Sequence, residues 1–501
     1  MFTQLLSSRR FAPIFWCQFF AALNDNFVKI ALGLLVVYKF GEETGEMLGQ
    51  LAGIALVAPF VIFSAIGGEM ADRFDKAKVA QNLKLVEIPV AAIAAAGFYF
   101  DLVPLLFLAL SLLGILAALF GPIKYGILPV HLKTEELSPG NALIEGATFV
   151  AVLLGTLAAG FVLTSDAKIN HDLLPTIALA IVGIAVVSWV SAHKIQPTGS
   201  AAPDLKINPN PVSSTLALIA DLQTDHRIWQ GALICGWFWL VGAVTLGLLP
   251  ALVKGTIGGL PSVYTAALLV FTVGIALGSI LAALASRVRP NLAVVPMGTI
   301  LMGLGLLDLA WTCAHIVKAN PAVGFTAFLA GSAGVRVLID LAVLAIGGGL
   351  YIVPSFAMVQ AWSPQDKRAR VVAGCNVISG LFMTAGALAS ITLQSAGAGL
   401  PLRLAIMGAA SLAVAFIVTK LWARTILKDF ANVVFRTLLR LEVKGEENLP
   451  PAGTKAIIAP NHISLLDAGI LHATMPGHTT YAIDTGMSQR SWIKPFLRYV
   501  N

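Results

Sequence analysis

His462 and Asp467, near the end of the chain, have the residue types and spacing for acid–base chemistry. They lie in Asn461-His-Ile-Ser-Leu-Leu-Asp467, directly after the apolar run 454–460. This run predicts a buried strand, and the residues after Asp467 predict a helix. At a strand-to-helix turn, a carboxylate can hold one ring nitrogen of a histidine while the other takes a proton from an attacking hydroxyl. The pattern predicts a catalytic pair in a separate domain covering residues 430–501.

A second group of polar residues interrupts a long apolar segment near the N-terminus. Asn24, Asp25, Asn26 and Lys29 lie within it. A charged side chain at the centre of a bilayer costs about 2.5–3.5 kcal/mol before it is paired, so such residues face a cavity or a partner. Asp25 and Lys29, four residues apart on one helix face, either neutralise each other or contact a polar substrate headgroup. We favour contact with a headgroup.

Two later apolar segments contribute a third group of candidates. Lys124 and Tyr125 close one segment, and Asn141 and Glu145 lie on one face of the next helix at i, i+4. Lys124 and Glu145 could pair across helices, or they could bind a phosphate and an amine. Other ionisable residues in apolar segments are further candidates, although local pairing or snorkelling explains most of them: Lys84, Glu87, Asp308, Arg336 and Asp340.

The composition indicates that the chain lies in a membrane and that helices position these residues there. Hydrophobic residues make up 57% of the 501 residues and charged residues 12%, and the mean hydropathy is +0.84. The chain therefore has more apolar surface than a water-soluble core can bury. Its apolar runs are about twenty residues long, the length that a helix needs to cross ~30 Å of hydrocarbon, and they lack the alternation of a β-barrel. The predicted class is an all-α membrane protein.

Twelve membrane-spanning segments are predicted, in two halves of six. They cover residues 11–38, 47–68, 79–100, 102–122, 142–164, 173–192, 228–252, 262–285, 292–314, 335–358, 371–396 and 402–423. Residues 321–334 could form a re-entrant piece, an interfacial helix or an extension of the tenth span. The halves are residues 1–195 and 228–425. Between them, residues 196–227 contain four prolines and predict a linker that does not order as a core element.

An internal repeat supports the two halves. Pro129 and Pro354 lie 225 residues apart, as do the Ser-Pro pairs that begin at Ser138 and Ser363. Each Ser-Pro pair precedes a helix that contains an asparagine, although the second copy has about ten additional residues there. A repeat of half the chain is typical of transporters.

The distribution of lysine and arginine predicts the orientation. With a cytoplasmic N-terminus, the basic residues of short loops gather on the cytoplasmic side: Arg9, Arg10, Arg73, Lys76, Lys78, Lys133, Arg287, Arg289, Lys367, Arg368 and Arg370. Both termini then lie in the cytoplasm, with no signal peptide removed. The net charge of +7 indicates contact with anionic membrane lipids, not with nucleic acid. The four cysteines fall inside predicted spans without metal-ligand spacing, so we expect no metal site and no cofactor.

The loop after the second span reads Gly68-Glu-Met-Ala-Asp72-Arg73-Phe-Asp-Lys76. It resembles the signature loop of the major facilitator superfamily, and twelve spans in two halves also fit that family. A tight turn that presents an acid to a neighbouring helix and cations to lipid could act as a conformational latch. The alternative is an ordinary basic cytoplasmic loop.

Three segments together resemble the lysophospholipid transporter (LplT) family, a branch of that superfamily. They are Ala-Leu-Asn-Asp-Asn in the first span, Gly-Pro-x-Lys-Tyr-Gly-x-Leu-Pro at the end of the fourth, and Asn-Ala-Leu-Ile-Glu-Gly-Ala-Thr-Phe in the fifth. The resemblance covers about residues 1–425. It implies a flippase that moves lysophospholipid, chiefly lysophosphatidylethanolamine, from the outer to the inner leaflet of a bacterial inner membrane. The seventh span of the family often carries an arginine, and residues 242–250 have none.

The tail resembles the first motif of the glycerolipid (PlsC-like) acyltransferase family, whose members take acyl groups from acyl-carrier protein or coenzyme A. The Glu-Gly-Thr-type motif that follows in the family does not occur before Asn501. We therefore expect an incomplete domain without acyltransferase activity in this chain, and a natural chain that continues into the reacylating enzyme. The predicted function is lysophospholipid transport coupled to reacylation. The alternatives are a membrane-anchored acyltransferase and a proton-coupled drug or sugar antiporter with Asp25 as proton carrier.

Overall fold

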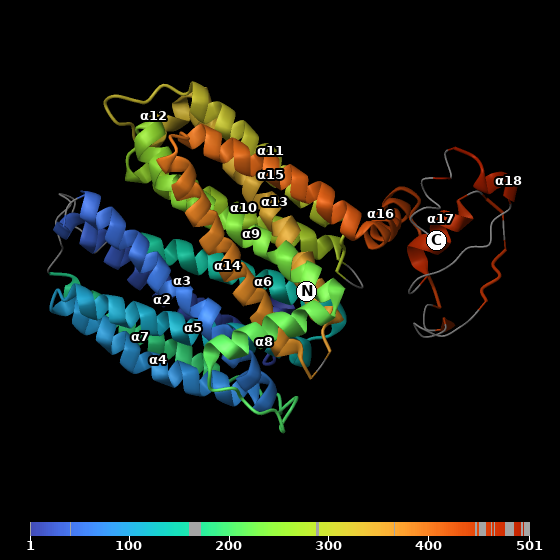
Figure 1. Ribbon diagram of the computed structural model, residues 1–501, viewed down its shortest axis with the longest axis horizontal. Helices are drawn as coiled ribbons and strands as arrows, with labels where there is room; N and C mark the ends of the chain where they lie inside the picture. Colours follow the sequence, from blue (N-terminus) through green and yellow to red (C-terminus); the bar gives the residue numbers. More distant parts are fainter. Residues whose placement is uncertain are drawn as a thin grey trace.

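The computed structural model consists of long helices that run side by side in one bundle, followed by a small tail (Figure 1). The structure describes residues 2–40, 42–159, 172–286, 290–364, 366–445, 448–449, 457–461, 463–464, 466–475, 485–491 and 494. His462, Arg287 and Arg289 lie outside the described residues.

The first group of long helices comes from the N-terminal part of the chain. After α1 (Phe2–Ser7) it contains α2 (Ala12–Phe40), α3 (Glu42–Arg73), α4 (Lys76–Tyr99), α5 (Val103–His131), α6 (Thr134–Ala159) and α7 (Leu174–His193). Within this group α2 packs on α3, α6 and α7, and α5 packs on α3 and α4. The apolar side chains between them form a continuous core.

The second group follows the helix α8 (Pro211–Thr224). It contains α9 (His226–Pro250) with its π-helical continuation η2 (Ala251–Ile257), α10 (Pro261–Ala285), α11 (Val294–His315), the short α12 (Phe325–Ala330), α13 (Ser332–Trp362), α14 (Arg368–Ser395) and α15 (Leu400–Leu421). Here α13 packs on α10 and α11, and α9 packs on α14. The two groups meet where α3 contacts α14 and where α6 contacts α10.

Eleven helices of the described chain are long and apolar enough to cross a membrane. They correspond to eleven of the twelve predicted spans. The remaining prediction, residues 11–38, falls on α2, which is as long as its neighbours but contains Asn24, Asp25, Asn26 and Lys29 in its middle. The chain is thus a multi-pass helical membrane protein. The sequence left three alternatives open for residues 321–334. Within this stretch, residues 325–330 form the short helix α12.

Two sequence predictions need correction. The linker is more ordered than its composition indicated, because α8 buries Ser214, Thr215, Leu218 and Leu222 along one face. The strand expected over residues 454–460 is not formed in its described part, residues 457–460. A strand is stable only when a neighbour completes its hydrogen bonds, and the described residues contain no strand to pair with it. The described tail consists of α16 (Ala423–Leu438), α17 (Asp467–Thr474), α18 (Thr485–Ser488) and irregular segments.

Glycines allow the central helices of the second group to approach closely. A Cβ atom at Gly278 of α10 would lie 2.1 Å from the Ile346 carbonyl oxygen of α13, and one at Gly349 would lie 2.4 Å from the Ile275 carbonyl oxygen. Helices in lipid associate mainly through such close packing, since no hydrophobic effect drives their association there.

We expect Gly278→Ala to lower the thermal unfolding temperature of the purified protein by several degrees. The added methyl group forces α10 and α13 apart, and overpacking typically costs about 1–3 kcal/mol. Gly183→Ala in α7 is the matched control, because nothing lies within 4 Å of its Cβ position. A thiol-reactive dye that detects exposure of the four buried cysteines measures unfolding. Equal unfolding temperatures for the two variants would contradict the expectation.

Candidate functional site

The polar residues of α2 are only partly paired with one another. Asn24 is buried and donates from Nδ2 to the Ile181 carbonyl oxygen of α7 at 3.3 Å, while its Oδ1 atom has no partner in the structure. Lys29 donates to Oδ1 of Asn26 at 3.0 Å. The Asp25–Lys29 ion pair that one alternative required is not formed, and no hydrogen bond or ion pair to Asp25 occurs in the described chain.

Lys84 and Glu87 of α4 form a buried local ion pair. Nζ of Lys84 lies 2.5 Å from Oε2 of Glu87, and both side chains are almost fully buried. The ammonium group also lies over the Phe120 ring, 4.3 Å from its centroid, a favourable position for a cation. These two charges therefore neutralise each other inside the first group of helices.

Tyr125 and Glu145 connect α5 and α6. The Tyr125 hydroxyl donates to Oε1 of Glu145, and Oε2 of the buried carboxylate has no partner in the structure. The Lys124–Glu145 ion pair considered from the sequence is not formed. Nζ of Lys124 instead lies 4.7 Å from the centroid of the Tyr125 ring, and the described chain offers it no hydrogen bond or ion pair.

Asp25 and Lys124 are thus one acid and one base without an ionic partner among the described residues. Both lie among other ionisable side chains of the first helix group. Asp25 is near enough to interact electrostatically with Glu87, Lys84, Lys124 and Lys29, and Lys124 with Glu145, Lys84 and Asp25. An unpaired charge among apolar helices is costly. The arrangement suits a ligand that brings a charge of each sign.

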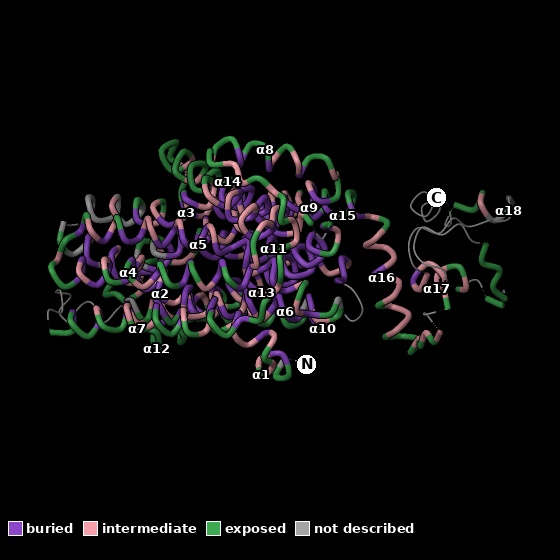
Figure 2. The backbone as a smooth tube through the Cα atoms, turned by 90° about the horizontal axis from the view of Figure 1, so that it is seen from below, coloured by how far each residue is buried: buried purple, intermediate pink, exposed green. Residues whose placement is uncertain are grey.

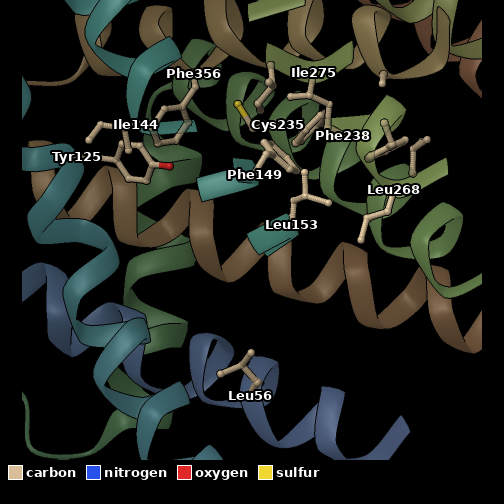
Figure 3. Packing of buried hydrophobic residues seen from close by; sticks show 14 of the residues in the cluster. Leu56, Tyr125, Ile144, Phe149, Leu153, Cys235, Phe238, Leu268, Ile275 and Phe356 are labelled. Atoms are coloured by element: carbon tan, nitrogen blue, oxygen red, sulfur yellow. The ribbon is translucent and has the colours of Figure 1, made fainter. Parts of the chain in front are cut away.

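Asn141 contacts the second group of helices. Its Nδ2 atom donates to Oε1 of Gln360 at 2.7 Å, and Gln360 donates to the Tyr125 carbonyl oxygen at 3.3 Å. The Tyr125 ring also packs edge-on against Phe356, with centroids 4.7 Å apart (Figure 3). Sequence reasoning missed Gln360, although an amide near the end of an apolar run is a detectable signal.

The predicted latch residues lie where α3 meets α14. A Cβ atom at Gly68 would be 2.8 Å from the Ala373 Cβ atom, so a larger residue would separate the helices. Asp72 is fully buried and pairs with Nε of Arg370 at 3.1 Å. Arg370, which sequence reasoning placed only among the basic loop residues, completes this pair between the two groups of helices.

The other two latch candidates lie outside that pair. Arg73 lies over the ring of Phe74, 5.3 Å from its centroid. Lys76 packs beside α5, where a Cβ atom at Gly126 would be 3.3 Å from its Cε atom. Neither side chain contributes to the Asp72–Arg370 ion pair.

Helix α8 lies across this contact between α3 and α14, which we call the seam. Ser214 and the backbone of Asn208 donate to the Glu69 carboxylate of α3 at 2.6 and 2.8 Å. At the other end, Asp221 pairs with Lys367, just before α14, at 2.9 Å. Leu218 packs between them in a small apolar cluster with residues of α3 and α14. The linker helix therefore binds both groups of helices at this end.

Asp75 attaches the segment before α8 to the start of α4. Burial of the Asp75 carboxylate works to raise its pKa, but hydrogen bonds from the backbone N–H groups of Gly199, Thr198, Ala77 and Lys78 outweigh this effect. The pKa of Asp75 therefore lies below its ordinary value. The carboxylate remains ionised at neutral pH and retains these bonds.

Two ionisable clusters lie elsewhere. Asp308 of α11 and Arg336 of α13 form an ion pair with both side chains nearly half exposed, and Asp340 is buried, with Thr312 Oγ1 at 3.5 Å. In the tail, the Asp467 carboxylate accepts the N–H groups of Ile463 and Ser464 at 2.6 and 2.8 Å. The predicted pair with His462 lies outside the described residues.

The second group of helices offers an apolar surface. A narrow apolar crevice of about 10 Å³ lies among α9, α10, α11 and α13. Its lining contains no ionisable side chain: Phe238, Val241, Gly242, Phe271, Ile275, Met302, Leu344, Ala345 and Gly348. Phe238 also packs edge-on against Phe149 of α6, with centroids 6.4 Å apart (Figure 3). The crevice therefore lies next to the first group of helices.

Curated relatives match part of the chain. The lysophospholipid transporter LplT of Yersinia pestis (strain Pestoides F) is 34% identical over 158 residues, which are 31% of this chain and 36% of the relative. LplT of Yersinia pseudotuberculosis serotype O:3 (strain YPIII) matches to the same extent. The match thus spans little more than a third of the length of these relatives. No protein-family model matches the chain.

Solved structures identify the fold. The fucose:proton symporter FucP of E. coli has a TM-score of 0.63 at 13% identity and covers 82% of this chain and 98% of its own. The human organic anion transporter MFSD10 has a TM-score of 0.64 at 14% identity, covering 82% and 99%. A bacterial homologue of ferroportin in an outward-facing state has a TM-score of 0.59 at 15% identity, covering 83% and 100%. The chain has the fold of major facilitator superfamily transporters.

Removing the charge of Asp72 is expected to open the seam between α3 and α14. Leu218→Cys places a thiol at the buried cluster under α8, and Asp72→Asn in this background should raise its rate of labelling by a water-soluble maleimide several-fold, since the ion pair with Arg370 is lost. Asp101→Asn is the control, because Asp101 forms its ion pair with Lys39, away from the seam. Equal labelling rates in all three backgrounds would show that the Asp72 charge does not hold the seam.

Proposed function

We propose that the protein is a lysophospholipid transporter that moves lysophosphatidylethanolamine-type lipids from the outer to the inner leaflet of a bacterial inner membrane. The similarity to LplT over 158 residues and the transporter fold support this proposal. The observation that carries it is the pair of opposite charges, Asp25 and Lys124, which are half-buried among the helices of the first group and have no ionic partner in the described chain.

The headgroup of the proposed substrate matches the unsatisfied groups of the first helix group. Its phosphate would bind Lys124, and its ammonium group would bind Asp25. An ammonium group has three N–H donors, and the buried acceptors without a partner in the structure include Oδ1 of Asn24 and Oε2 of Glu145. Tyr125 would orient Glu145 through its hydroxyl group. Asn26 and Lys29 would add further polar groups from α2 to the headgroup site.

The single acyl chain needs the opposite environment. The apolar side chains that line the narrow crevice among α9, α10, α11 and α13 offer such a surface beside the first helix group, and the crevice would widen to admit the chain. The proposed headgroup site thus lies in the proposed N-terminal half, residues 1–195, while the crevice lies in the proposed C-terminal half, residues 228–425. This asymmetry suits a lipid with a zwitterionic head and one apolar tail.

We also propose that both termini face the cytoplasm and that the seam of α3 and α14 closes the cytoplasmic end. In this orientation the latch residues Gly68 and Asp72, together with Arg370, hold the end that faces the inner leaflet. Arg73 and Lys76 would contact the headgroups of anionic lipids there. Rocking of one half against the other would exchange access to the headgroup site.

A different reading of Asp25 is that it carries a proton in a drug or sugar antiporter. FucP is described as a fucose:proton symporter, but its identity of 13% supports the fold alone. An acid without an ionic partner would fit this role, whereas Lys124 would have no assigned part in it. We therefore prefer lysophospholipid as the substrate.

Uptake of labelled lysophosphatidylethanolamine into proteoliposomes tests the proposal. We expect Asp25→Asn and Lys124→Gln each to lower the uptake rate at least about tenfold, equivalent to ~1.4 kcal/mol, because each removes one charge that would bind the headgroup. Asp101→Asn removes a carboxylate that is ion-paired away from the cluster and should retain full uptake. Asparagine tolerates the φ of 53° at that position.

Two results would contradict the proposal. Absence of lysophospholipid uptake by the parent protein would exclude the substrate. Uptake that strictly requires a pH gradient and is abolished by Asp25→Asn, but is unaffected by Lys124→Gln, would favour the role of Asp25 as proton carrier.

The tail supports one further function, a membrane-anchored acyltransferase that uses acyl-carrier protein or acyl-coenzyme A. This alternative rests on Asn461, His462 and Asp467. It assigns no role to the charged residues within the helices. We expect the purified 501-residue chain to transfer no acyl group from either donor to a lysophospholipid. Transfer that His462→Ala abolishes would establish the enzyme instead.

A further inference from the structure

Helix α16 is strongly amphipathic and leaves its apolar face exposed. Phe430 is 58% exposed, Val433 36% and Leu438 75%, and at 3.6 residues per turn all three lie on one side of the helix. Soluble proteins rarely expose several large apolar side chains together on one helix face. Such a face marks a site that contacts a partner.

The opposite face of α16 is already occupied by α17. Asn432 donates to the Ala473 carbonyl oxygen at 3.0 Å, and Lys428 donates to the Met475 carbonyl oxygen. At 100° per residue, Asn432 points about 160° away from Phe430. The apolar face is therefore turned away from the tail segment that packs on α16.

The position of α16 relative to the membrane spans is fixed by two contacts. Trp422, which separates α15 from α16, is buried and packs against Trp362 of α13, with ring centroids 5.8 Å apart. Seven residues later, the Asp429 carboxylate accepts the backbone N–H of Leu292 at 2.9 Å, just before α11. Figure 2 shows that α16 runs across the direction of the long helices, at the end of the bundle.

The exposed apolar surface also continues from the last span into α16. Phe416, Ile417 and Leu421 of α15 are each about half exposed or more, as expected for side chains that face lipid. Because α15 is long and apolar enough to cross a membrane and α16 turns across its axis within one residue, the apolar face of α16 lies at the end of the last span.

We propose that α16 is an interfacial helix, with its apolar face inserted at the boundary between headgroups and acyl chains of the same bilayer. The partner of this face is lipid and not a second protein. Its burial would remove Phe430, Val433 and Leu438 from water while the side that carries Asn432 stays polar, as in other interfacial amphipathic helices.

This assignment determines where the tail lies. Since α17 packs on the polar side of α16, the Asp467 turn would be held on the surface of the membrane, about one helix diameter of ~10 Å from the lipid. The inference does not depend on the substrate of the transporter, and it would stand if lysophospholipid were not transported.

Site-directed spin labelling of the full chain in vesicles of phosphatidylethanolamine and phosphatidylglycerol tests the proposal. The four native cysteines are buried, so a thiol introduced by Phe430→Cys or Leu438→Cys is labelled selectively. Dissolved oxygen concentrates in lipid, whereas a neutral nickel complex concentrates in water. We expect the ratio of oxygen to nickel accessibility at both positions to be several-fold higher than at an aqueous control.

Gln223→Cys provides the aqueous control, because Gln223 is exposed on α8. Leu277→Cys, exposed in the middle of α10, provides the lipid control, and positions 430 and 438 should give ratios between these two. A ratio at 430 and 438 equal to that at 223 would place the face in water. Low accessibility to both reagents would indicate a protein partner. Either result would overturn the proposal.

Discussion

The structure depends on the requirement that a charge buried among apolar helices must find a partner. Desolvation of an unpaired charge costs more than most single packing contacts contribute. Lys84 and Glu87 meet this requirement within one helix, and Asp72 and Arg370 meet it between two. The buried Glu145 carboxylate and the half-buried Asp25, Lys29 and Lys124 do not meet it within the described chain. The first helix group thus contains charged side chains that lack counter-charges, and a ligand with a charge of each sign would supply them.

The same requirement explains why one end of the bundle is so extensively bonded. The buried Asp72 carboxylate is neutralised by an arginine from the other helix group, so closure of the seam and satisfaction of the charge are the same event. The close approach at Gly68 is possible because glycine has no side chain to intervene. Helix α8 then adds bonds from Glu69 on one side of the seam to Lys367 on the other. Separation of the helix groups here would break all of these contacts together.

The tail obeys a different constraint, because it lies beyond the last span. Its first helix has one face that suits lipid and another that suits the protein, and the bonds of Asn432 and Lys428 assign the protein face to α17. The remaining apolar face continues the lipid-facing surface of α15. A domain attached in this way would stay at the membrane without a span of its own.

The sequence by itself determined the class, the spans and the polar positions, because apolar runs of about twenty residues and charges within them are local patterns. The positions of Asp25, Lys124, Asp72 and Glu145 were all identified in this way. Their partners could not be, because pairing depends on which helices become neighbours. Lys124 and Glu145 suggested an ion pair, but the Tyr125 hydroxyl reaches that carboxylate instead. Gln360, Arg370 and the ordered face of α8 acquired their roles only when segments distant in the chain came within a few ångströms of one another, which is a property of the tertiary structure.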